Sequence, residues 1–176
     1  AIQERLLDDT RIDFAIFSED RLDPKLDSEI LGCEPVLLAV SPDHPLAAGH
    51  PDFLAAGGNY PLLDWTMISD AKFILHFPEQ NTGAITQRLL EKHHIKPGIP
   101  FYTRNTQAAL LLASQNQGIC FAPETYIRSM SFERPPVCFS LGDDEAFTTT
   151  ILAFRRGAYL TAYAQDFICI AKEYFS

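Results

Sequence analysis

Short polar side chains follow three apolar stretches of this 176-residue chain. Amide and hydroxyl groups donate hydrogen bonds to a carboxylate without adding charge to the site. In an open parallel sheet, such groups lie beyond the carboxyl ends of strands, where the free N–H groups of helix N-termini attract anions. We therefore predict a site for a small anion or polar organic acid. Its candidate contacts are Ser18, Phe77, Gln80, Asn81, Thr82, Asn105 and Thr106.

These residues also have a purely structural interpretation, because Asn, Ser and Thr cap helices and shape turns. Their recurrence after successive strands favours binding. Hydrolase, metalloprotease and nucleotide-binding functions have no support, since GxSxG, HExxH, phosphate-loop and GxGxxG motifs are absent. His93 and His94 are adjacent and point apart on a helix, and the acidic turn 143–145 is more typical of a solvated turn than of a cation site. We predict no catalytic residue, no metal and no cofactor.

Composition narrows the classes of protein further. Hydrophobic residues form 47% of the chain, which indicates a globular protein, and the net charge is −9. The largest basic cluster is the pair Arg155-Arg156, so direct nucleic-acid binding by this chain is not expected. The cysteines are widely spaced, as expected for small buried side chains in a reducing compartment. No signal peptide or membrane-spanning run is evident, which predicts a cytoplasmic location. The cysteines are Cys33, Cys120, Cys138 and Cys169.

The stretch 34–47, EPVLLAVSPDHPLA, organises the predicted elements. Residues 36–40 form an uninterrupted apolar run, which predicts a strand buried on both faces. Pro42 and Pro45 then turn the chain away from the sheet, and His44 is expected to shape this turn. The strand is predicted to carry the chain from one lobe into another.

Residues 72–123 alternate between strand and helix patterns. Strands are predicted at 73–76, 99–103 and 119–122, and this order implies parallel pairing with right-handed crossovers. The intervening helices are predicted at 84–93 and 107–116. Asn105 or Thr106 caps the second helix, and Gly118 is expected to adopt a left-handed conformation after it.

The two ends of the chain are predicted to share one lobe. A helix end at 2–9 leads into a strand at 11–17, and a later strand at 148–154 precedes a helix capped by Thr161. That last helix is expected to cover the first lobe. A chain that opens on the end of a helix lacks the strand that completes a βαβ unit, so we expect a segment to be missing before it.

Four stretches taken together resemble the effector-binding domain of LysR-type transcriptional regulators. They are IDFAIF at 12–17, EPVLLAVSPDHPLA at 34–47, FILH at 73–76 and ASQNQGICFAPETYI at 113–127. The HPLA ending matches the family pattern in full. Ala122 replaces the usual leucine before Pro123, and Thr10-Arg11 stands where a glycine is common. The resemblance covers nearly the whole chain in one order.

The resemblance implies an α/β, two-lobed fold like that of type 2 periplasmic binding proteins, with two crossover strands joining the lobes. Lobe I is expected at 1–37 plus 151–176, with its first strand-helix-strand missing, and lobe II at 38–150. The implied function is ligand sensing in a bacterial transcription regulator, with a small effector, an organic acid, between the lobes. DNA contact is expected only through a winged helix-turn-helix domain absent from this chain, and the full-length protein is expected to be a homodimer or tetramer.

Two other functions stay open for such a fold. A solute-binding protein of a transporter would carry a signal peptide upstream. An enzyme, such as an aromatic-pathway dehydratase or a phosphoribosyltransferase, would need an acid/base or nucleophile pair, and none is apparent. A non-enzymatic regulatory domain is therefore the preferred prediction.

Overall fold

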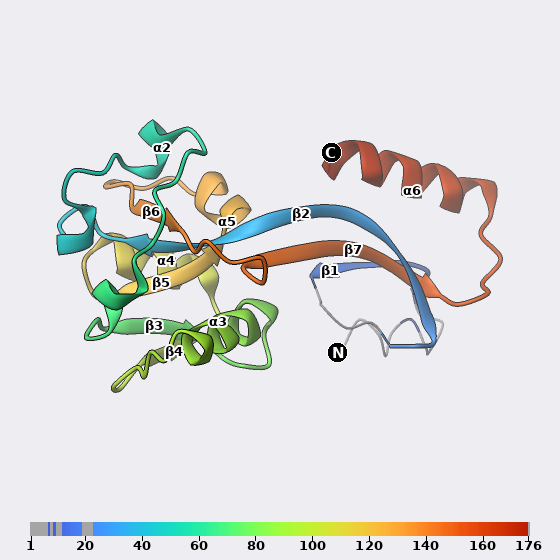
Figure 1. Cartoon of the computed structure of the whole chain (residues 1–176). Coiled ribbons are helices and arrows are strands. Elements are labelled where there is room, and N and C mark those ends of the chain that lie inside the picture. The colour runs from blue at the N-terminus through green and yellow to red at the C-terminus, as the bar shows by residue number, and fades with distance from the viewer. Residues whose placement is uncertain (1–6, 8, 10–11, 19–22, 176) are drawn as a thin grey trace. The chain divides into compact units, whose positions relative to one another are not determined.

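The computed structural model describes residues 7, 9, 12–18 and 23–175. The chain divides into two compact units, Ala1–Cys33 with Thr148–Ser176 (unit 1) and Glu34–Phe147 (unit 2). Strands β2 (Leu26–Val40) and β7 (Phe147–Arg155) each contain one of the two boundaries, so each carries the chain from one unit into the other (Figure 1). The lobe boundaries expected from the sequence, 37/38 and 150/151, fall in the same two strands.

Unit 2 is built on a mixed sheet of strand order β6-β2-β5-β3-β4. Strand β3 pairs in parallel with both β4 and β5, as the alternating strand and helix pattern predicts. Strand β2 pairs antiparallel with β5 on one side and with β6 on the other. The strands of unit 2 besides β2 are β3 (Phe73–His76), β4 (Phe101–Thr103), β5 (Ile119–Pro123) and β6 (Val137–Ser140).

Helices cover both faces of this sheet. Val36, Leu38 and Val40 pack in one core with Ile85 and Leu89 of a helix on one face. The alternate side chains of the same strand, Leu37 and Ala39, pack in a second core with residues of other helices. The predicted burial of residues 36–40 on both faces is therefore confirmed. The helices of unit 2 are α2 (Phe53–Ala56), α3 (Asn81–Lys92), α4 (Thr106–Ser114), α5 (Glu124–Ser129), and the 3₁₀ turns η1 (Pro45–Ala47) and η2 (Trp65–Ile68).

Local capping follows the sequence at two of these helices. The Asn105 side chain accepts a hydrogen bond from the Ala108 N–H at 3.0 Å, as expected for the cap of α4. The His44 ring accepts from the Leu46 N–H at 3.2 Å and begins η1, so its predicted turn-forming role is confirmed.

Two details of unit 2 differ from the sequence prediction. Helix α3 begins at Asn81 rather than residue 84, so Asn81 and Thr82 lie in its first turn and not in a loop. The residue with positive φ after α4 is Asn116 (φ 60°), not Gly118. A Cβ on Gly118 would lie 2.7 Å from the Lys72 carbonyl oxygen, so close packing explains this glycine. The physical cause in both cases is contact with β3 or the chain next to it, which local patterns do not encode.

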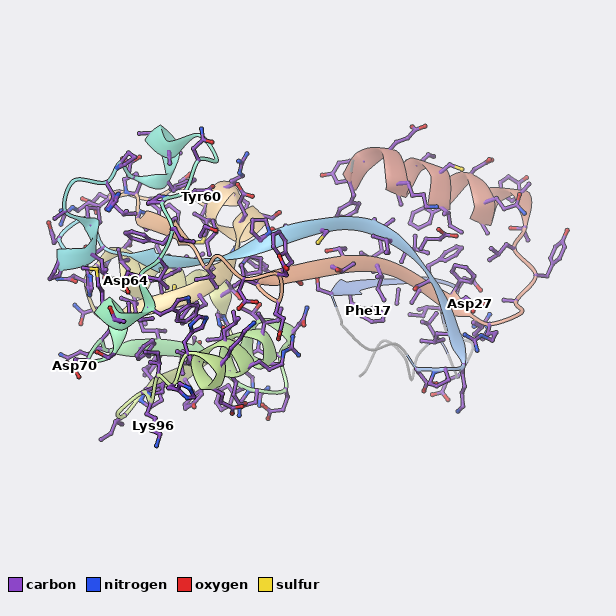
Figure 2. All side chains as sticks on the ribbon, viewed as in Figure 1. Phe17, Asp27, Tyr60, Asp64, Asp70 and Lys96 are labelled. Carbon is purple, nitrogen blue, oxygen red and sulfur yellow. The ribbon has the colours of Figure 1, made fainter. Side chains whose placement is uncertain are left out.

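Unit 1 contains β1 (Ala15–Ser18), which pairs antiparallel with β7, and α6 (Ala162–Phe175). Phe17 packs against the apolar cluster on one face of these strands, while Asp27 accepts a hydrogen bond from Arg156 Nε at 2.9 Å (Figure 2). On the other face, α6 packs through Ile168 and Ala171, which confirms that the last helix covers the first unit.

Two predictions for unit 1 need correction. The strand expected at 11–17 begins at Ala15 and includes Ser18, because pairing with β7 starts there. The helix end expected at 2–9 lies mostly outside the described residues. Phe167 and Tyr174 belong to the apolar face that the sequence pattern predicts for α6. Both side chains are exposed, so that face is only partly buried.

Two of the cysteines are buried next to the central strand. Cys120 and Cys138 both pair with Ala39, one from each neighbouring strand, and burial raises the pKa of Cys120 to about 12. At neutral pH this thiol stays protonated, as suits a packing residue. Cys33 on β2 and Cys169 on α6 are exposed, so the expectation that these two cysteines are buried is wrong.

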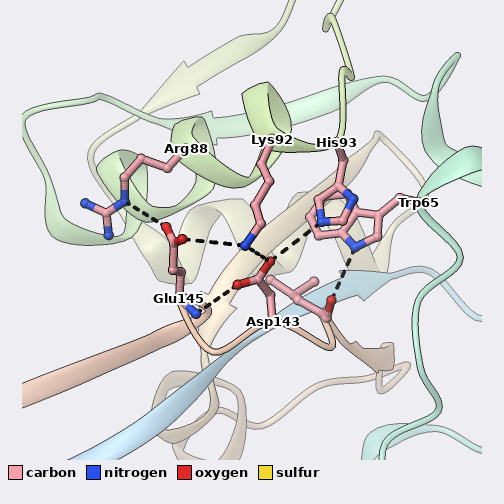
Figure 3. Close-up of polar contacts among 7 residues, drawn as sticks. Trp65, Arg88, Lys92, His93, Asp143 and Glu145 are labelled. Atoms are coloured by element: carbon pink, nitrogen blue, oxygen red, sulfur yellow. Dashed lines mark hydrogen bonds and ion pairs between the residues drawn. The ribbon is translucent and has the colours of Figure 1, made fainter.

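An ion-pair network holds the turn between β6 and β7 against α3 (Figure 3). Lys92 Nζ lies 2.7 Å from Asp143 Oδ2, whose side chain is 8% exposed. The other oxygen of Asp143 accepts from the Glu145 N–H at 2.9 Å. Trp65 stacks on His93 at 4.1 Å between ring centroids and donates to the Leu141 carbonyl, so it packs rather than binds a ligand. The acidic turn is thus anchored by ion pairs, not merely solvated.

Replacing Asp143 with Asn is expected to lower the melting temperature at pH 7 by roughly 2–4 °C. The hydrogen bond from Lys92, then that from the Glu145 N–H, holds the pKa of Asp143 below its ordinary value of 3.8. A depressed carboxyl pKa stabilises the fold above the unfolded value, and this contribution is lost as the pH falls through the folded pKa. Thermal melts from pH 7 to pH 2.5 should show the difference between the two proteins shrinking in acid. Asp144→Asn, an exposed change of equal charge, serves as the control.

Candidate ligand-binding site

The carboxyl ends of β3 and β4 lie side by side in unit 2. Their parallel register pairs His76 with Thr103, and α3 and α4 begin a few residues later. Six of the seven candidate residues therefore come together at this edge of the sheet. They are Phe77, Gln80, Asn81, Thr82, Asn105 and Thr106.

Ser18 is the seventh candidate and belongs to unit 1. It is the last residue of β1 and pairs with Thr150 of β7. Its Oγ lies 3.2 Å from Thr150 Oγ1, so its hydroxyl has a structural partner within unit 1. The loop position that the sequence suggested for Ser18 is wrong, and its part in binding stays a prediction.

The first turn of α3 approaches the end of β3 very closely. A Cβ on Gly83 would lie 2.1 Å from the Phe77 carbonyl oxygen and 2.9 Å from that of His76. Only glycine tolerates this approach, because any side chain would collide with backbone. Gly83 therefore sets the position of the α3 N-terminus relative to the strand end.

Gln80 links the two neighbouring loops. Its N–H donates to the Phe77 carbonyl at 2.9 Å, and its side-chain Nε2 donates to the Arg104 carbonyl at 3.1 Å. Gln80 is the N-cap of α3, but its side chain makes no capping hydrogen bond. Its Oε1 is buried and has no hydrogen-bond partner among the described residues. An unpaired buried acceptor is costly, so this amide is available for a donor group on a ligand.

His76 and Thr106 form the buried floor of the edge. His76 is 3% exposed, and its Nε2 lies 3.1 Å from Thr106 Oγ1 on the first turn of α4. Burial lowers the pKa of His76 below its ordinary value of 6.5, so the ring is neutral at pH 7. A neutral imidazole can donate one hydrogen bond and accept another, and here it ties β3 to α4.

Arg104 supplies positive charge at the rim. Its guanidinium carbon lies 4.5 Å from the centroid of the Phe77 ring, which itself packs against Tyr102 at 5.3 Å. Arg104 Nη2 lies 3.5 Å from Glu79 Oε1, and both side chains are about two-thirds exposed, so this ion pair is weak. The arginine can turn toward an incoming anion at little cost.

Taken together, the edge offers a cation, two helix N-termini and neutral donors around a neutral histidine. Helix N-termini carry partial positive charge, so the arrangement favours a small anion over a cation. Asn105 caps α4 through its Oδ1, and its part in binding stays a prediction.

Sequence reasoning missed two members of this site, His76 and Arg104. Each is adjacent to a candidate, and a polar residue ending the apolar run FILH was a signal that could have revealed His76. Within the described part of the chain, no group of His, Cys, Asp or Glu residues could hold a metal ion. The same residues include no helix with the length and apolar character that a membrane span requires.

The fold and this edge define an α/β ligand-binding domain of the type 2 periplasmic-binding-protein class. The family model described as the LysR substrate binding domain matches residues 2–176. The chain therefore belongs to the LysR substrate-binding domain family, a family of ligand-sensing regulatory domains, as the resemblance implied. Among curated proteins, no sequence matches this chain.

Solved structures share the fold at low sequence identity. The effector-binding domain of BenM with its effector benzoate is 22% identical, with a TM-score of 0.78 over 99% of this chain and 74% of that chain. The effector-binding domain of QuiR in complex with shikimate is 20% identical, with a TM-score of 0.73 over 97% of this chain and 75% of that one. The regulatory domain of Synechocystis PCC6803 CcmR in complex with 2-PG is 16% identical, with a TM-score of 0.79 over 98% and 77%.

Replacing Gly83 with Ala is expected to destabilise unit 2 by about 3 kcal/mol, because the new methyl group meets backbone oxygens that cannot move aside. Urea unfolding measures this change. Gly98→Ala is the matched control, since no atom lies within 4 Å of a Cβ there and its stability should be unchanged or slightly higher. Equal stabilities for the two variants would contradict the close approach described for α3.

Replacing Thr106 with Val keeps the shape of the side chain but removes the partner of the buried His76. Leaving one polar group unpaired is expected to cost about 1–3 kcal/mol in the free energy of unfolding. Thr106→Ser retains the hydroxyl and should lose much less. Denaturant titration of both variants measures the difference, and a Val variant as stable as the Ser variant would show that the His76 hydrogen bond adds nothing.

Proposed function

We propose that this chain senses a small carboxylate for a bacterial transcription regulator and binds it at the carboxyl edge of β3 and β4. The observation that carries this proposal is the convergence of two helix N-termini, Arg104 and the amide of Gln80 at one edge of the sheet. The carboxylate faces the helix N-termini and Arg104, and its hydroxyl or ring substituents meet Gln80 and Thr82. The two lobes expected from the sequence correspond to units 1 and 2.

The ligands of the related structures support the chemical class. Benzoate and shikimate, bound by BenM and QuiR, are both small carboxylates. At 20–22% identity these structures carry the fold alone, so the class of effector rests on the charge and donors of this chain. The net charge also supports the proposal that this chain does not itself contact DNA. With a net charge of −9, this chain is not suited to bind the phosphate backbone, so DNA contact belongs to another part of the regulator. In this proposal the regulator works in the cytoplasm as a homo-oligomer.

We infer a binding domain rather than an enzyme. The described edge offers one buried histidine, His76, whose lowered pKa and hydrogen bond to Thr106 suit a structural role. General acid–base catalysis needs a positioned side chain that can exchange a proton with the substrate, and a buried ring already hydrogen-bonded to Thr106 does not suit that task. Turnover of small carboxylates by the purified protein would favour the enzyme alternative instead.

The carboxylate site is tested by isothermal titration with a panel that includes benzoate and shikimate. Arg104→Gln is expected to weaken the binding of the preferred acid at least tenfold, because a charge-assisted hydrogen bond contributes about 1.5–3 kcal/mol. Lys96→Gln is the matched control. Lys96 is an exposed cation on the connection from α3 to β4 and points away from the sheet (Figure 2), so its loss should leave affinity unchanged.

A second variant probes the floor of the site. Replacing Asn81 and Thr106 together with alanine should also weaken binding of the same acid at least tenfold. Affinity equal to wild type in this double variant would place the effector elsewhere, even if the protein still binds the acid.

A further inference from the structure

A cavity of about 220 Å³ lies within unit 2, between α3 and the strands β3 and β4. Strand β4 is the last strand of the sheet, has three residues, and buries none of them completely. Such a short edge strand supplies too little side-chain volume to fill the space beneath α3. The cavity is therefore a consequence of how the sheet ends; it borders the carboxyl edge of β3 at His76 and Gly83, and Arg104 is not in its wall.

The walls of this cavity are mainly apolar. Leu75 of β3 and Leu90 of α3 are 7% and 4% exposed and face it together with Pro78, Ile95 and Tyr102. This pocket is half open to solvent, and because an apolar cavity of about 150 Å³ can hold benzene, its volume of about 220 Å³ has room for a six-membered ring with one or two substituents.

One buried polar group in the wall lacks a partner. Thr86 lies in the middle of α3 and is 3% exposed, and its Oγ1 makes no hydrogen bond to any residue that the structure describes. A threonine in a helix can donate to the carbonyl four residues earlier, but this hydroxyl does not. A buried hydroxyl without a partner costs free energy that a ligand hydroxyl would restore. Thr86 thus defines where the polar atom of a ligand would sit.

The charge of the wall decides what kind of ligand fits. No lysine or arginine is among its described residues, and its one ionised group is Glu91, which accepts a hydrogen bond from Gln87 Nε2 at 2.9 Å. A carboxylate would lose its hydration here and would face a like charge, so anions are excluded. This selectivity is opposite to that of the edge that carries Arg104.

We propose that the cavity beneath α3 is a second ligand site, which binds a neutral compound of the size of phenol. Its ring packs against Leu75, Leu90 and Tyr102, and its hydroxyl exchanges a hydrogen bond with Thr86. Its wall includes His76 and Gly83 at the carboxyl edge of β3, but not Arg104, Gln80 or Thr106, so the two ligands are distinguished by the competition test below.

Phenol and toluene are matched probes, since both have seven non-hydrogen atoms and only phenol has a hydroxyl. Titration of the intact chain with each, followed by methyl NMR shifts of Leu75 and Leu90, measures affinity and location together. Saturable phenol binding that shifts both leucines is expected. Thr86→Val should reduce the ratio of phenol to toluene affinity about tenfold while toluene still binds, which shows that the cavity survives.

Thr125→Val is the matched control, a threonine-to-valine change at an exposed position of the helix α5. It should leave both affinities unchanged, and benzoate should neither shift the two leucines nor displace phenol. An unaltered phenol-to-toluene ratio in Thr86→Val would overturn the assignment of the hydroxyl. Absence of saturable phenol binding, or competition between phenol and benzoate for one site, would overturn the second site itself.

Discussion

Burial of residues 36–40 on both faces of the sheet is the constraint on which unit 2 depends. Each of these side chains is at most 1% exposed, and hydrogen bonds occupy both edges of the strand through β5 and β6. Both faces of this strand are buried and both of its edges are hydrogen-bonded, so its register cannot shift by one residue. Such a shift would move the side chains of each core to the opposite face of the sheet. It therefore places β5, and through β5 it places β3 and β4, whose carboxyl ends form the candidate site.

The polar residues of that edge differ in how many of their hydrogen-bonding groups already have partners in the fold. Asn105 caps α4 through its Oδ1, and Ser18 of unit 1 pairs with Thr150. Gln80 is shared, since its Nε2 joins two loops while its Oε1 stays without a partner. Within the described part of the chain, the Arg104 side chain contacts an aromatic ring and forms one weak ion pair. The groups best placed to bind a ligand are those whose hydrogen bonds the fold leaves incomplete.

Helix α3 separates two chemically distinct environments. Its N-terminal turn lies beside a cation and hydrogen-bond donors, which suit a carboxylate, whereas its middle covers an apolar cavity with one unpaired hydroxyl at Thr86. Its C-terminal end is tied to the turn before β7 through Lys92 and Asp143. Successive turns of one helix thus have different surroundings, because each turn faces a different neighbour.

By itself, the sequence determined the strands with uninterrupted apolar runs, their parallel order, and the turn at His44 and the cap at Asn105. These features depend on residues within a few positions of one another, so local patterns suffice to predict them. Most of the candidate edge was predictable for the same reason.

Only the tertiary structure decided the early start of α3, the role of Gly118, the exposure of Cys169 and the pairing of His76 with Thr106. The unpaired hydroxyl of Thr86 belongs to the same group. Each of these depends on which distant segment packs against the residue, and a single sequence contains no local signal for that neighbour.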